Sequence, residues 1–439
     1  MNFLEQVREA GIVGAGGAGF PAHVKFDTQT EYLIANGAEC EPLIRSDRRI
    51  MEAYALDIVR AMNAAAEHTG AEKLVIAVKS HYEKAVTALK KAVEGTKITV
   101  HVMKSTYPSG DEQTLVYDVT GRVVPPGCLP PDVKTVVSNV ATLVNIAGAL
   151  EGKPVTEKTL TVTGAVKNPV TVNVPIGTPI SAVIEAAGGF EPDSGGHEVI
   201  LGGPLMGFPA ESLDDPVTKT TGGILALPKG HLLLTYKHAD MERQAKLARA
   251  VCCQCSVCTQ LCPRYILGLG VSPHKAMRSL SAQKGTLLGD HNSIFGCCEC
   301  GICTYYACNF GLSPQLVMGN FKKALAKEGV KPKKEAAGPV DPGMETKKIP
   351  QKRLLSRLAL AKYDRDAPLV PFTVKVPQLY IPLKMHIGAP CKPTVEKGAA
   401  VTKGMVIGTP NGLGAFIHSP VNGTVAGVTA EQIVIRTES

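Results

Sequence analysis

The sequence predicts a multidomain protein of the α/β and α+β classes. A Rossmann-like α/β domain should be followed by a β-grasp module, a helical cysteine-rich domain and a C-terminal barrel-sandwich hybrid. The chain has 439 residues, more than one hydrophobic core ordinarily organises. Short apolar strands alternate with helices in the first third, whereas Thr/Val-rich strands dominate two later segments. The 44 glycines and 31 prolines favour turns and short strands over long helices.

Charge and hydropathy exclude several classes of protein. The net charge of +8 is moderate, and much of it lies between Lys322 and Arg357 without interleaved aromatic residues. We therefore expect a solvated linker there and no nucleic-acid partner. No apolar run is long enough to cross a bilayer, and the acidic N-terminus does not resemble a signal peptide. We expect a cytoplasmic protein without direct membrane insertion, in which the 13 cysteines point to metal ligation rather than disulfides, although the isolated Cys40, Cys128 and Cys391 are expected to be buried in the core.

Residues 1–155 are expected to form the α/β domain. An amphipathic helix at residues 1–10 comes first, and strands and helices then alternate in the manner of a largely parallel sheet. One expected strand ends near residue 39, and two others cover residues 73–80 and 97–103. The expected helices cover residues 48–68 and 81–93.

The stretch "GIVGAGGAGFP" satisfies a G-x-G-x-x-G pattern through Gly14, Gly16 and Gly19, and Glu39 follows about 20 residues later. In a dinucleotide-binding Rossmann fold, a buried strand runs into this pattern. Here the preceding "MNFLEQVREA" has helical periodicity, so the simple Rossmann interpretation fails.

The β-grasp module is expected over residues 156–235. The stretch "KTLTVTGAVKNPVTVNVPIGTPI" alternates Thr and Val on both sides of an Asn-Pro turn. One helix, "ISAVIEAAGG", follows and is closed by glycines.

Residues 236–325 should form a two-cluster ferredoxin-like domain that begins with a helix over residues 241–251. Two runs of cysteines at C-x2-C-x2-C spacing follow that helix, as in the bacterial ferredoxins that hold 4Fe-4S clusters. Zinc sites instead use pairs of C-x-x-C. The predicted ligands are Cys252, Cys255, Cys258, Cys262, Cys297, Cys300, Cys303 and Cys308.

In the crossed arrangement of two-cluster ferredoxins, the fourth cysteine of each run binds the other cluster. Cys308 would then join the first run and Cys262 the second. The last gap of the second run is one residue longer than that of the first, and Cys298 competes with Cys297 as a ligand. That last assignment stays open at this point.

Residues 326–372 are expected to form the basic linker with a short helix at "RLLSRLALAKY". Residues 373–439 show two Gly-rich halves of similar texture, which predicts a barrel-sandwich hybrid. Biotinyl and lipoyl carriers of this type bear a modified lysine at a hairpin tip. The comparable turn near residues 411–414 has none, so we expect a structural module.

Several short motifs occur in a characteristic order: "GAGGAGFPAHVKF", "NGAECEP", "YPSGDEQTL", "VSNVATL", "GGPLMG" and the two cysteine runs. Together they resemble the flavin-carrying, NADH-oxidising subunit of complex I and, more closely, the RnfC subunit of Rnf-type ferredoxin:NAD oxidoreductases. The segment "IPLKMHIGAP" precedes the flavin domain in RnfC but follows the cysteine runs here. This order resembles the cobalamin reductases of bacterial propanediol-utilisation microcompartments.

The resemblance implies an FMN site and an adjoining NADH cleft. Its implied contacts to the FMN phosphate, ribityl chain and ring are Gly14, Gly16, Gly17, Lys25, Asn36, Asn139 and Thr142. Phe20 would stack on the nicotinamide nucleotide. The cleft would be lined by Glu41, Tyr107, Gly110, Asp111 and Glu112. Complex I has Arg and Asp where this chain has Ala15 and Ala38, so we expect looser nucleotide binding.

The implied activity is transfer of electrons from NADH through FMN and two 4Fe-4S clusters to cobalamin. No side chain is required as a general acid or base, because the cofactors carry the chemistry. An adenosyltransferase and a microcompartment shell protein are the implied partners, and the protein would lie inside or attached to a microcompartment. Two alternatives remain: an Rnf-like electron-transfer subunit, and a non-catalytic relay docked to the shell. The corrinoid-binding motif D-x-H-x-x-G is absent.

Overall fold

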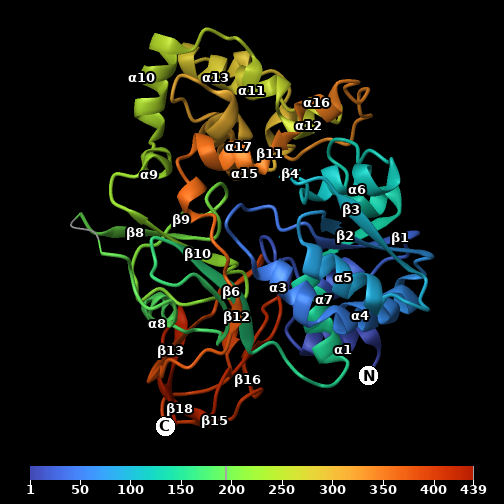
Figure 1. Cartoon of the computed structure of the whole chain (residues 1–439), viewed down its shortest axis with the longest axis vertical. Coiled ribbons are helices and arrows are strands. Elements are labelled where there is room, and N and C mark those ends of the chain that lie inside the picture. Colours follow the sequence, from blue (N-terminus) through green and yellow to red (C-terminus); the bar gives the residue numbers. More distant parts are fainter. Residues whose placement is uncertain (193–194, 439) are drawn as a thin grey trace.

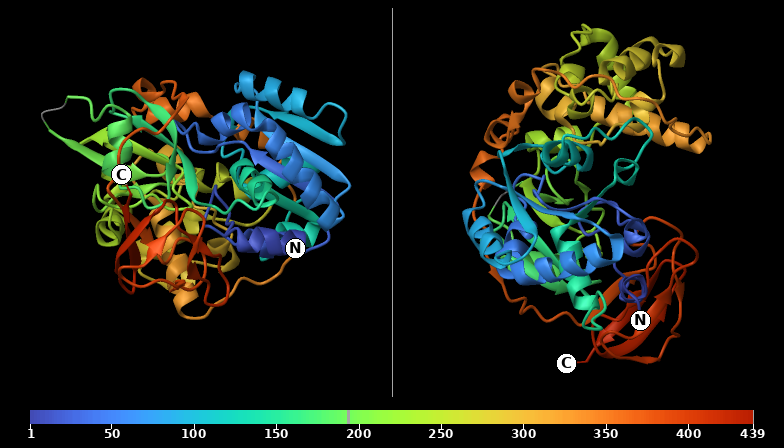
Figure 2. Two further views of the ribbon diagram at one scale, coloured as in Figure 1. Left: turned by 90° about the horizontal axis from the view of Figure 1, so that it is seen from below. Right: turned by 90° about the vertical axis from the view of Figure 1, so that its right-hand side faces the viewer.

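The computed structural model describes residues 1–192 and 195–438. Figure 1 shows an elongated molecule with the cysteine-rich helical domain at one end and the C-terminal β-structure at the other. The α/β domain and the β-grasp sheet lie side by side between them. Figure 2 shows that the N-terminal helix lies at the same end as the C-terminal β-structure. The predicted multidomain α/β and α+β architecture is confirmed.

The α/β domain is built on a parallel sheet in the order β3-β2-β1-β5. Its elements are α1 (Phe3–Glu9), α2 (Ala22–Phe26), β1 (Tyr32–Gly37), α3 (Ser46–Ala53), α4 (Ala55–Thr69), β2 (Lys73–Lys79), α5 (Glu83–Ala92), β3 (Ile98–Met103), β4 (Thr106–Tyr107), α6 (Glu112–Thr120), a 3-10 turn (Pro130–Val133), β5 (Thr135–Asn139) and α7 (Val140–Ala149). Leu33, Ile34 and Ile76 of the inner strands β1 and β2 are fully buried because helices cover both faces there, whereas Val102 of the edge strand β3 is exposed.

The predicted helix over residues 48–68 is wrong in one respect, because the chain breaks at Tyr54 into α3 and α4. Both helices contact α5 and α7, but α3 also contacts strand β6 (Glu157–Gly164) of the β-grasp sheet. Tyr54, with φ −124° and ψ 30°, makes the change of direction between them.

The strand order reverses between β1 and β5. The chain runs from β1 outward through β2 to β3 and then returns to place β5 on the other side of β1. Asn36 and Asn139, the polar residues at the carboxyl ends of these two strands, are register partners. Ligands of open α/β sheets bind outside the carboxyl ends of the strands at such a reversal.

The β-grasp unit carries a mixed sheet in the order β12-β7-β6-β10-β8-β9. Its elements are β6 (Glu157–Gly164), β7 (Val170–Pro175), α8 (Ile180–Ala186), β8 (His197–Leu201), β9 (Phe208–Pro209), β10 (Gly223–Pro228) and the later β12 (Leu369–Val370). The predicted Asn-Pro turn joins the antiparallel pair β6 and β7. Ile180, Val183 and Ile184 of α8 are buried in the core of this unit.

The cysteine-rich domain is helical and has its own core around Val271, Met277 and Val317. Its elements are α9 (Leu232–Lys237), α10 (Met241–Val251), α11 (Val257–Gln260), α12 (Pro263–Ile266), α13 (Pro273–Ala282), a 3-10 turn (Gly285–Leu287), α14 (Asn292–Phe295), a π-helix (Cys303–Ala307) and α15 (Pro314–Lys327). The helix expected over residues 241–251 is present with those bounds.

The basic linker returns from the cysteine-rich domain to the α/β domain. Its elements are α16 (Met344–Lys347), β11 (Ile349–Pro350), α17 (Gln351–Arg357) and a 3-10 turn (Ala361–Tyr363). Strand β11 pairs antiparallel with β4 through Ile349 and Tyr107. The helix expected to continue to residue 363 ends at Arg357. Ala359 has a φ of 56°, which a right-handed helix does not accommodate.

The C-terminal unit has two small sheets, β13-β19-β18-β15 and β14-β16-β17. Its strands are β13 (Gln378–Pro382), β14 (Lys392–Pro393), β15 (Ala400–Val401), β16 (Val406–Thr409), β17 (Ile417–His418), β18 (Gly423–Val428) and β19 (Gln432–Thr437). Ile381, Ile407 and Ile433 are fully buried between them and join one continuous core with the α/β domain. Among the described residues, no helix is long and apolar enough to span a membrane.

Candidate redox site

The glycine loop lies between α1 and α2 and is closed by a bridge from Val13 to Pro21. Gly14 N–H donates to the carbonyl of Phe20 at 2.9 Å. The exposed N–H groups of Gly16, Gly17 and Ala18 have no acceptor in the described part of the chain. Adjacent free N–H groups in a turn form a concave site for an anion such as a phosphate.

The loop is held by α7 of its own domain and by β6 of the β-grasp unit. Ala15 N–H donates to Thr142 Oγ1 at 2.9 Å, and the Ala15 carbonyl accepts from Lys158 Nζ at 2.8 Å. Burial lowers the pKa of Lys158 to about 8, with Asp47 opposing the shift. A Cβ atom on Gly16 would lie 2.7 Å from Asn139 Nδ2, so only glycine fits where the loop meets the end of β5. These contacts fit a flavin phosphate between the loop and the sheet edge.

The sheet edge supplies polar side chains next to the glycine loop. Asn36 Nδ2 donates to the carbonyl of Gly110 at 3.0 Å, which ties the end of β1 to the loop after β4. Asn139 Oδ1 accepts from the N–H of Ala141 at 2.8 Å and so caps α7. Lys25 Nζ donates to Glu112 Oε1 at 2.8 Å and to the carbonyl of Val137 at 2.9 Å.

The structure thus brings the predicted FMN residues to one edge of the sheet. They are Gly14, Gly16, Gly17, Lys25, Asn36, Asn139 and Thr142. Their individual contacts with FMN stay a prediction.

A carboxyl pair that sequence reasoning did not assign, half-buried Glu39 and buried Asp47, lies behind this edge. Glu39 Oε2 accepts the backbone N–H of Asp47 at 2.9 Å, and Asn139 Nδ2 donates to Asp47 Oδ2 at 2.7 Å. Burial raises the pKa of Glu39 to about 8, and the nearby Asp47 carboxylate adds to that shift. Burial also raises the pKa of Asp47 to about 6. The pair places a protonatable group beside the cleft.

Glu41, predicted to line the nucleotide cleft, holds the "GGPLMG" turn of the β-grasp unit. Its carboxylate accepts from the N–H groups of Leu205 at 2.8 Å and Met206 at 3.0 Å. A Cβ atom on Gly203 would lie 2.1 Å from Glu41 Oε2, so glycine is required for this close approach. Lys237 Nζ donates to two carbonyls of the same turn.

Tyr107 lies where the α/β domain meets the cysteine-rich domain. Its hydroxyl donates to the carbonyl of Cys300 at 2.6 Å, and its ring is buried. Gly110 N–H donates to Cys40 Sγ at 2.9 Å. Phe20 is half-buried at the base of the glycine loop. The nucleotide contacts of these residues stay predictions.

Asp111 links the two domains through a largely buried ion pair with Arg264. Its carboxylate accepts two hydrogen bonds from Arg264, at 2.8 and 2.7 Å, and it caps α6 through the N–H of Thr114 at 3.2 Å. The exposed fractions of the Arg264 and Asp111 side chains are 11% and 8%. Burial opposes ionisation of Asp111, but Arg264 overcomes this and lowers the pKa of the carboxyl below its usual value. Arg264 follows the predicted ligand Cys262 by two residues.

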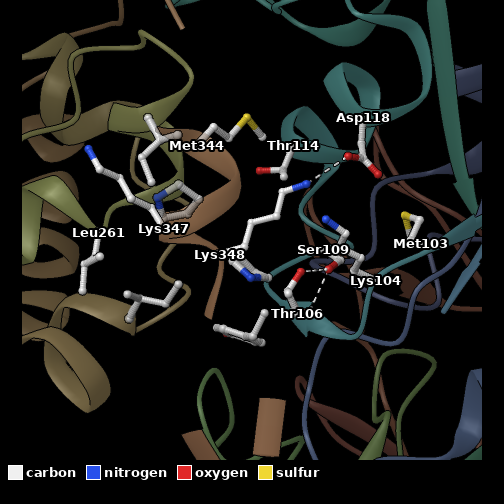
Figure 3. Close-up of a pocket in the computed structure, with 15 residues that line it drawn as sticks. Met103, Lys104, Thr106, Ser109, Thr114, Asp118, Leu261, Met344, Lys347 and Lys348 are labelled. Atoms are coloured by element: carbon white, nitrogen blue, oxygen red, sulfur yellow. Dashed lines mark hydrogen bonds and ion pairs between the residues drawn. The ribbon is translucent and has the colours of Figure 1, made fainter. Parts of the chain in front are cut away.

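A small cavity of about 40 Å³ remains in the same seam. Figure 3 shows Thr106, Ser109 and Asp118 of the α/β domain facing Leu261 of the cysteine-rich domain and Lys348 of the linker. Lys348 Nζ lies 3.3 Å from Asp118 Oδ1. The cavity has room only for a few water molecules, so the domains meet in a nearly filled seam.

The two cysteine runs adopt the same backbone conformation. In the first run, Gln254 and Ser256 have φ of 56° and 59°. In the second, Glu299 and Gly301 have φ of 56° and 78° at the equivalent positions. Such left-handed residues between the cysteines curve the chain around a central group. This register pairs Cys297 with Cys252 and leaves Cys298 equivalent to Cys253.

The longer final gap of the second run is accommodated by the π-helix Cys303–Ala307. A π-turn takes one residue more than an α-turn, so it absorbs the extra residue. The fourth cysteines then have similar extended conformations: Cys262 has φ −69° and ψ 121°, and Cys308 has φ −84° and ψ 123°.

Electrostatic coupling shows which thiols gather. Burial raises the pKa of Cys258 to about 12, and Cys255, Cys308 and Cys252 raise it further. The pKa of Cys262 is likewise raised by burial and then by Cys298 and Cys297, and that of Cys303 by burial and then by Cys297, Cys262 and Cys258. Apart from Cys258 acting on Cys303, these influences follow the crossed grouping, and the assignment of each ligand stays a prediction.

The thiols do not converge on one point. No three His, Cys, Asp or Glu side chains of the described residues lie as ligands of a single ion would. Each cysteine of a 4Fe-4S cluster binds a different iron, so two groups of four spaced thiols fit such clusters.

The two cysteine groups differ in burial and position. Cys262, Cys300 and Cys303 are buried, and their group touches the α/β domain through Tyr107 and Arg264. We call the group of Cys262, Cys297, Cys300 and Cys303 the inner centre. The other group, Cys252, Cys255, Cys258 and Cys308, has an exposed member and is called the outer centre.

Comparison with known families matches four segments of the chain. Residues 7–148 match the Nuo51 FMN-binding domain, and residues 159–209 match the SLBB domain. Residues 251–313 match a 4Fe-4S dicluster domain, and residues 363–439 match the RnfC barrel sandwich hybrid domain.

Similar proteins include two that match along almost the whole chain. The cobalamin reductase PduS of Salmonella typhimurium is 41% identical over 437 residues, covering 98% of this chain and 95% of that protein. The protein of the same name from Citrobacter freundii is 40% identical with the same coverage. One component of the Na+-translocating ferredoxin:NAD+ oxidoreductase complex of Acetobacterium woodii is 38% identical, covering 62% of this chain and 59% of that protein. An NAD+-reducing [NiFe]-hydrogenase aligns with a TM-score of 0.49 at 22% identity, over 74% of this chain and 61% of that one.

Proposed function

This chain belongs to the cobalamin reductase family, and we propose that it reduces cobalamin with electrons taken from NADH. Similarity to two such reductases along 98% of the chain supports this function. FMN accepts a hydride and releases electrons singly, and 4Fe-4S clusters carry one electron each. One NADH therefore reduces two cob(III)alamin molecules to cob(II)alamin, with release of NAD+ and a proton.

The contacts between the domains support an order for the electron path. The sheet edge is tied through Asn36 and Gly110 to the loop that carries Tyr107 and Asp111. Tyr107 and Asp111 in turn bind the Cys300 carbonyl and Arg264 beside the inner centre. Electrons would pass from the cleft to the inner centre and then to the outer centre. Glu41 and Asp111 would act as positioning residues, because their carboxylates are occupied by backbone N–H groups and by Arg264, respectively.

NADH would approach the cleft near Phe20 and Glu112. Phe20 is half-buried beside the glycine loop, and the Glu112 side chain is 39% exposed. An aromatic face is suited to stacking on a nicotinamide nucleotide, and a carboxylate is suited to accepting a hydrogen bond from a ribose hydroxyl.

The cellular setting that we propose is a propanediol-degrading microcompartment. An adenosyltransferase would receive the cob(II)alamin there, and a shell protein would anchor the reductase.

The proposed function is tested with Gly16→Val. The valine side chain would collide with Asn139 and fill the concave anion site formed by the N–H groups of the glycine loop, which we call the anion cradle. The variant should therefore lose FMN and retain the iron and sulfide of two clusters. Gly427→Ala is the matched control, because a Cβ atom there meets nothing within 4 Å. Flavin extraction, iron and sulfide analysis and the EPR spectrum after NADH addition measure the outcome.

The electron acceptor is tested on the native holoprotein. We expect NADH to convert cob(III)alamin to cob(II)alamin, as followed by its visible spectrum. NADH oxidation with ferredoxin as acceptor but not with cob(III)alamin would overturn the proposal in favour of an Rnf-like electron-transfer protein.

A further inference from the structure

A depression of about 590 Å³ opens beside the outer centre. Its apolar wall consists of Val257, Leu261, Tyr306 and Ala307. Val257 precedes Cys258 and Ala307 precedes Cys308, so two lining residues are chain neighbours of predicted cluster ligands. A molecule in this depression would therefore lie against the more exposed of the two centres.

The opposite wall of the depression is cationic. Lys352, Arg353 and Arg357 of α17 line it, together with Ser356, and no carboxylate is among the lining residues. Arg357 is held in place, because it donates to the carbonyls of Tyr305 at 3.2 Å and Cys308 at 3.1 Å.

Lys352 and Arg353 are exposed, and neither has an ion-pair partner among the described residues. Their charges are therefore available to an incoming anion. Helix α17 thus presents three cationic side chains to the depression: Arg357, which is held by backbone carbonyls, and Lys352 and Arg353, which the described residues leave without an ion-pair partner.

We propose that this depression is the cobalamin-binding site, with Lys352 and Arg353 holding the phosphodiester of cobalamin and the apolar wall meeting the edge of its corrin ring. The inference rests on the proposed function, since it names where the substrate of that function binds. Cobalamin combines a broad, largely apolar macrocycle with a single anionic phosphodiester. The depression offers a matching combination of aromatic, aliphatic and cationic surface.

The depression has the volume of a small-molecule site and is open to solvent. Cobalamin is larger than the depression, so part of it would stay outside and accessible to a second protein. A cluster held by Cys252, Cys255, Cys258 and Cys308 would supply one electron to each cobalamin molecule in the depression, which would take its cobalt from Co(III) to Co(II) and release the displaced ligand to water.

The test compares Lys352→Glu/Arg353→Glu with Lys392→Glu/Lys397→Glu. Both double variants change the net charge by the same amount, and the second pair is exposed on the distant C-terminal unit. Binding of cob(II)alamin and of cobinamide, which lacks the phosphodiester, is measured by anaerobic equilibrium dialysis with the holoprotein. We expect the α17 variant to bind cob(II)alamin at least tenfold more weakly and cobinamide unchanged. The control variant should bind both as the native protein does.

A second variant, Ser356→Glu, places a carboxylate in the depression without touching a predicted cluster ligand. It should also weaken cob(II)alamin binding. EPR after NADH addition should show both clusters reduced in every variant, which separates loss of the site from loss of the redox chain.

Unchanged cob(II)alamin binding in the α17 variant would overturn the inference and leave the proposed function standing. A defect seen only when adenosyltransferase is present would also overturn it, in favour of docking by an acidic protein surface. Failure of the native holoprotein to bind or reduce cobalamin, with both clusters reduced by NADH, would instead refute the proposed function.

Discussion

Replacing Arg264 with Met tests whether the Asp111 pair couples the flavin cleft to the inner centre. Both side chains are about nine-tenths buried, so the variant leaves Asp111 as a buried charge without a partner. Such a loss costs about 3–5 kcal/mol, and 3 kcal/mol corresponds to roughly a 150-fold change in an equilibrium such as domain docking. Contacts such as the Tyr107–Cys300 hydrogen bond remain, so we expect at least tenfold slower cluster reduction rather than complete loss.

Stopped-flow absorbance after mixing with NADH provides the assay, because flavin and cluster reduction are followed separately. Flavin should be reduced at the native rate in Arg264→Met. Asp111→Asn/Arg264→Met should recover part of the loss, since asparagine is neutral and still caps α6. Lys246→Met, which breaks an exposed pair with Glu242, should change neither rate. Native cluster reduction in Arg264→Met would refute the reasoning. At pH 7 both Asp111 and Arg264 are charged. The stability that the Asp111–Arg264 pair contributes is lost only as the pH falls through the lowered pKa of Asp111.

Two further predictions concern the cluster loops and the carboxyl pair of Glu39 and Asp47. Cys298→Ser and Cys253→Ser should each retain eight irons per chain, whereas Cys297→Ser should lose the cluster of the inner centre. Iron analysis and EPR measure how many clusters each variant holds. Loss of a cluster in Cys298→Ser but not in Cys297→Ser would make Cys298 the ligand instead. Glu39→Gln should gain stability relative to the native protein as pH rises from about 4.5 to about 8, because the raised pKa of Glu39 means that ionisation there opposes folding. The difference should approach roughly 1.4 kcal/mol per pH unit in that window, and urea unfolding midpoints that stay parallel across it would contradict the result.

Much of the architecture could be predicted because local patterns encode it. Alternation of apolar strands and helices indicated the parallel sheet, and the cysteine spacing indicated both cluster loops. The helix that breaks at Tyr54 shows the limit of such patterns. Residues on both sides of Tyr54 have helical periodicity, but α3 also packs against strand β6 of the β-grasp unit, a tertiary contact that no local pattern encodes.

The interactions that organise the site escaped prediction for a related reason. Asp111 and Arg264 are 153 residues apart, and Glu41 and Leu205 are 164 residues apart. No periodicity or spacing connects such partners. The π-helix escaped as well, because the extra residue before Cys308 reads in sequence as an irregularity, whereas in the structure it preserves the conformation of the fourth cysteine.

The C-terminal unit gains a physical role from its contact with the glycine loop. A Cβ atom on Gly19 would lie 3.0 Å from the Thr220 side chain and 3.1 Å from the His386 backbone, so the loop is enclosed by two other units. Buried Lys219 donates to the carbonyls of Gly11 at 2.7 Å and Phe416 at 2.6 Å, which fastens the β-grasp unit to both ends of the chain. A carrier domain must move to deliver its cofactor, whereas these buried contacts hold the C-terminal unit in place. Together with the lack of lysine at residues 411–414, they favour a scaffold that keeps the anion cradle formed before a ligand arrives.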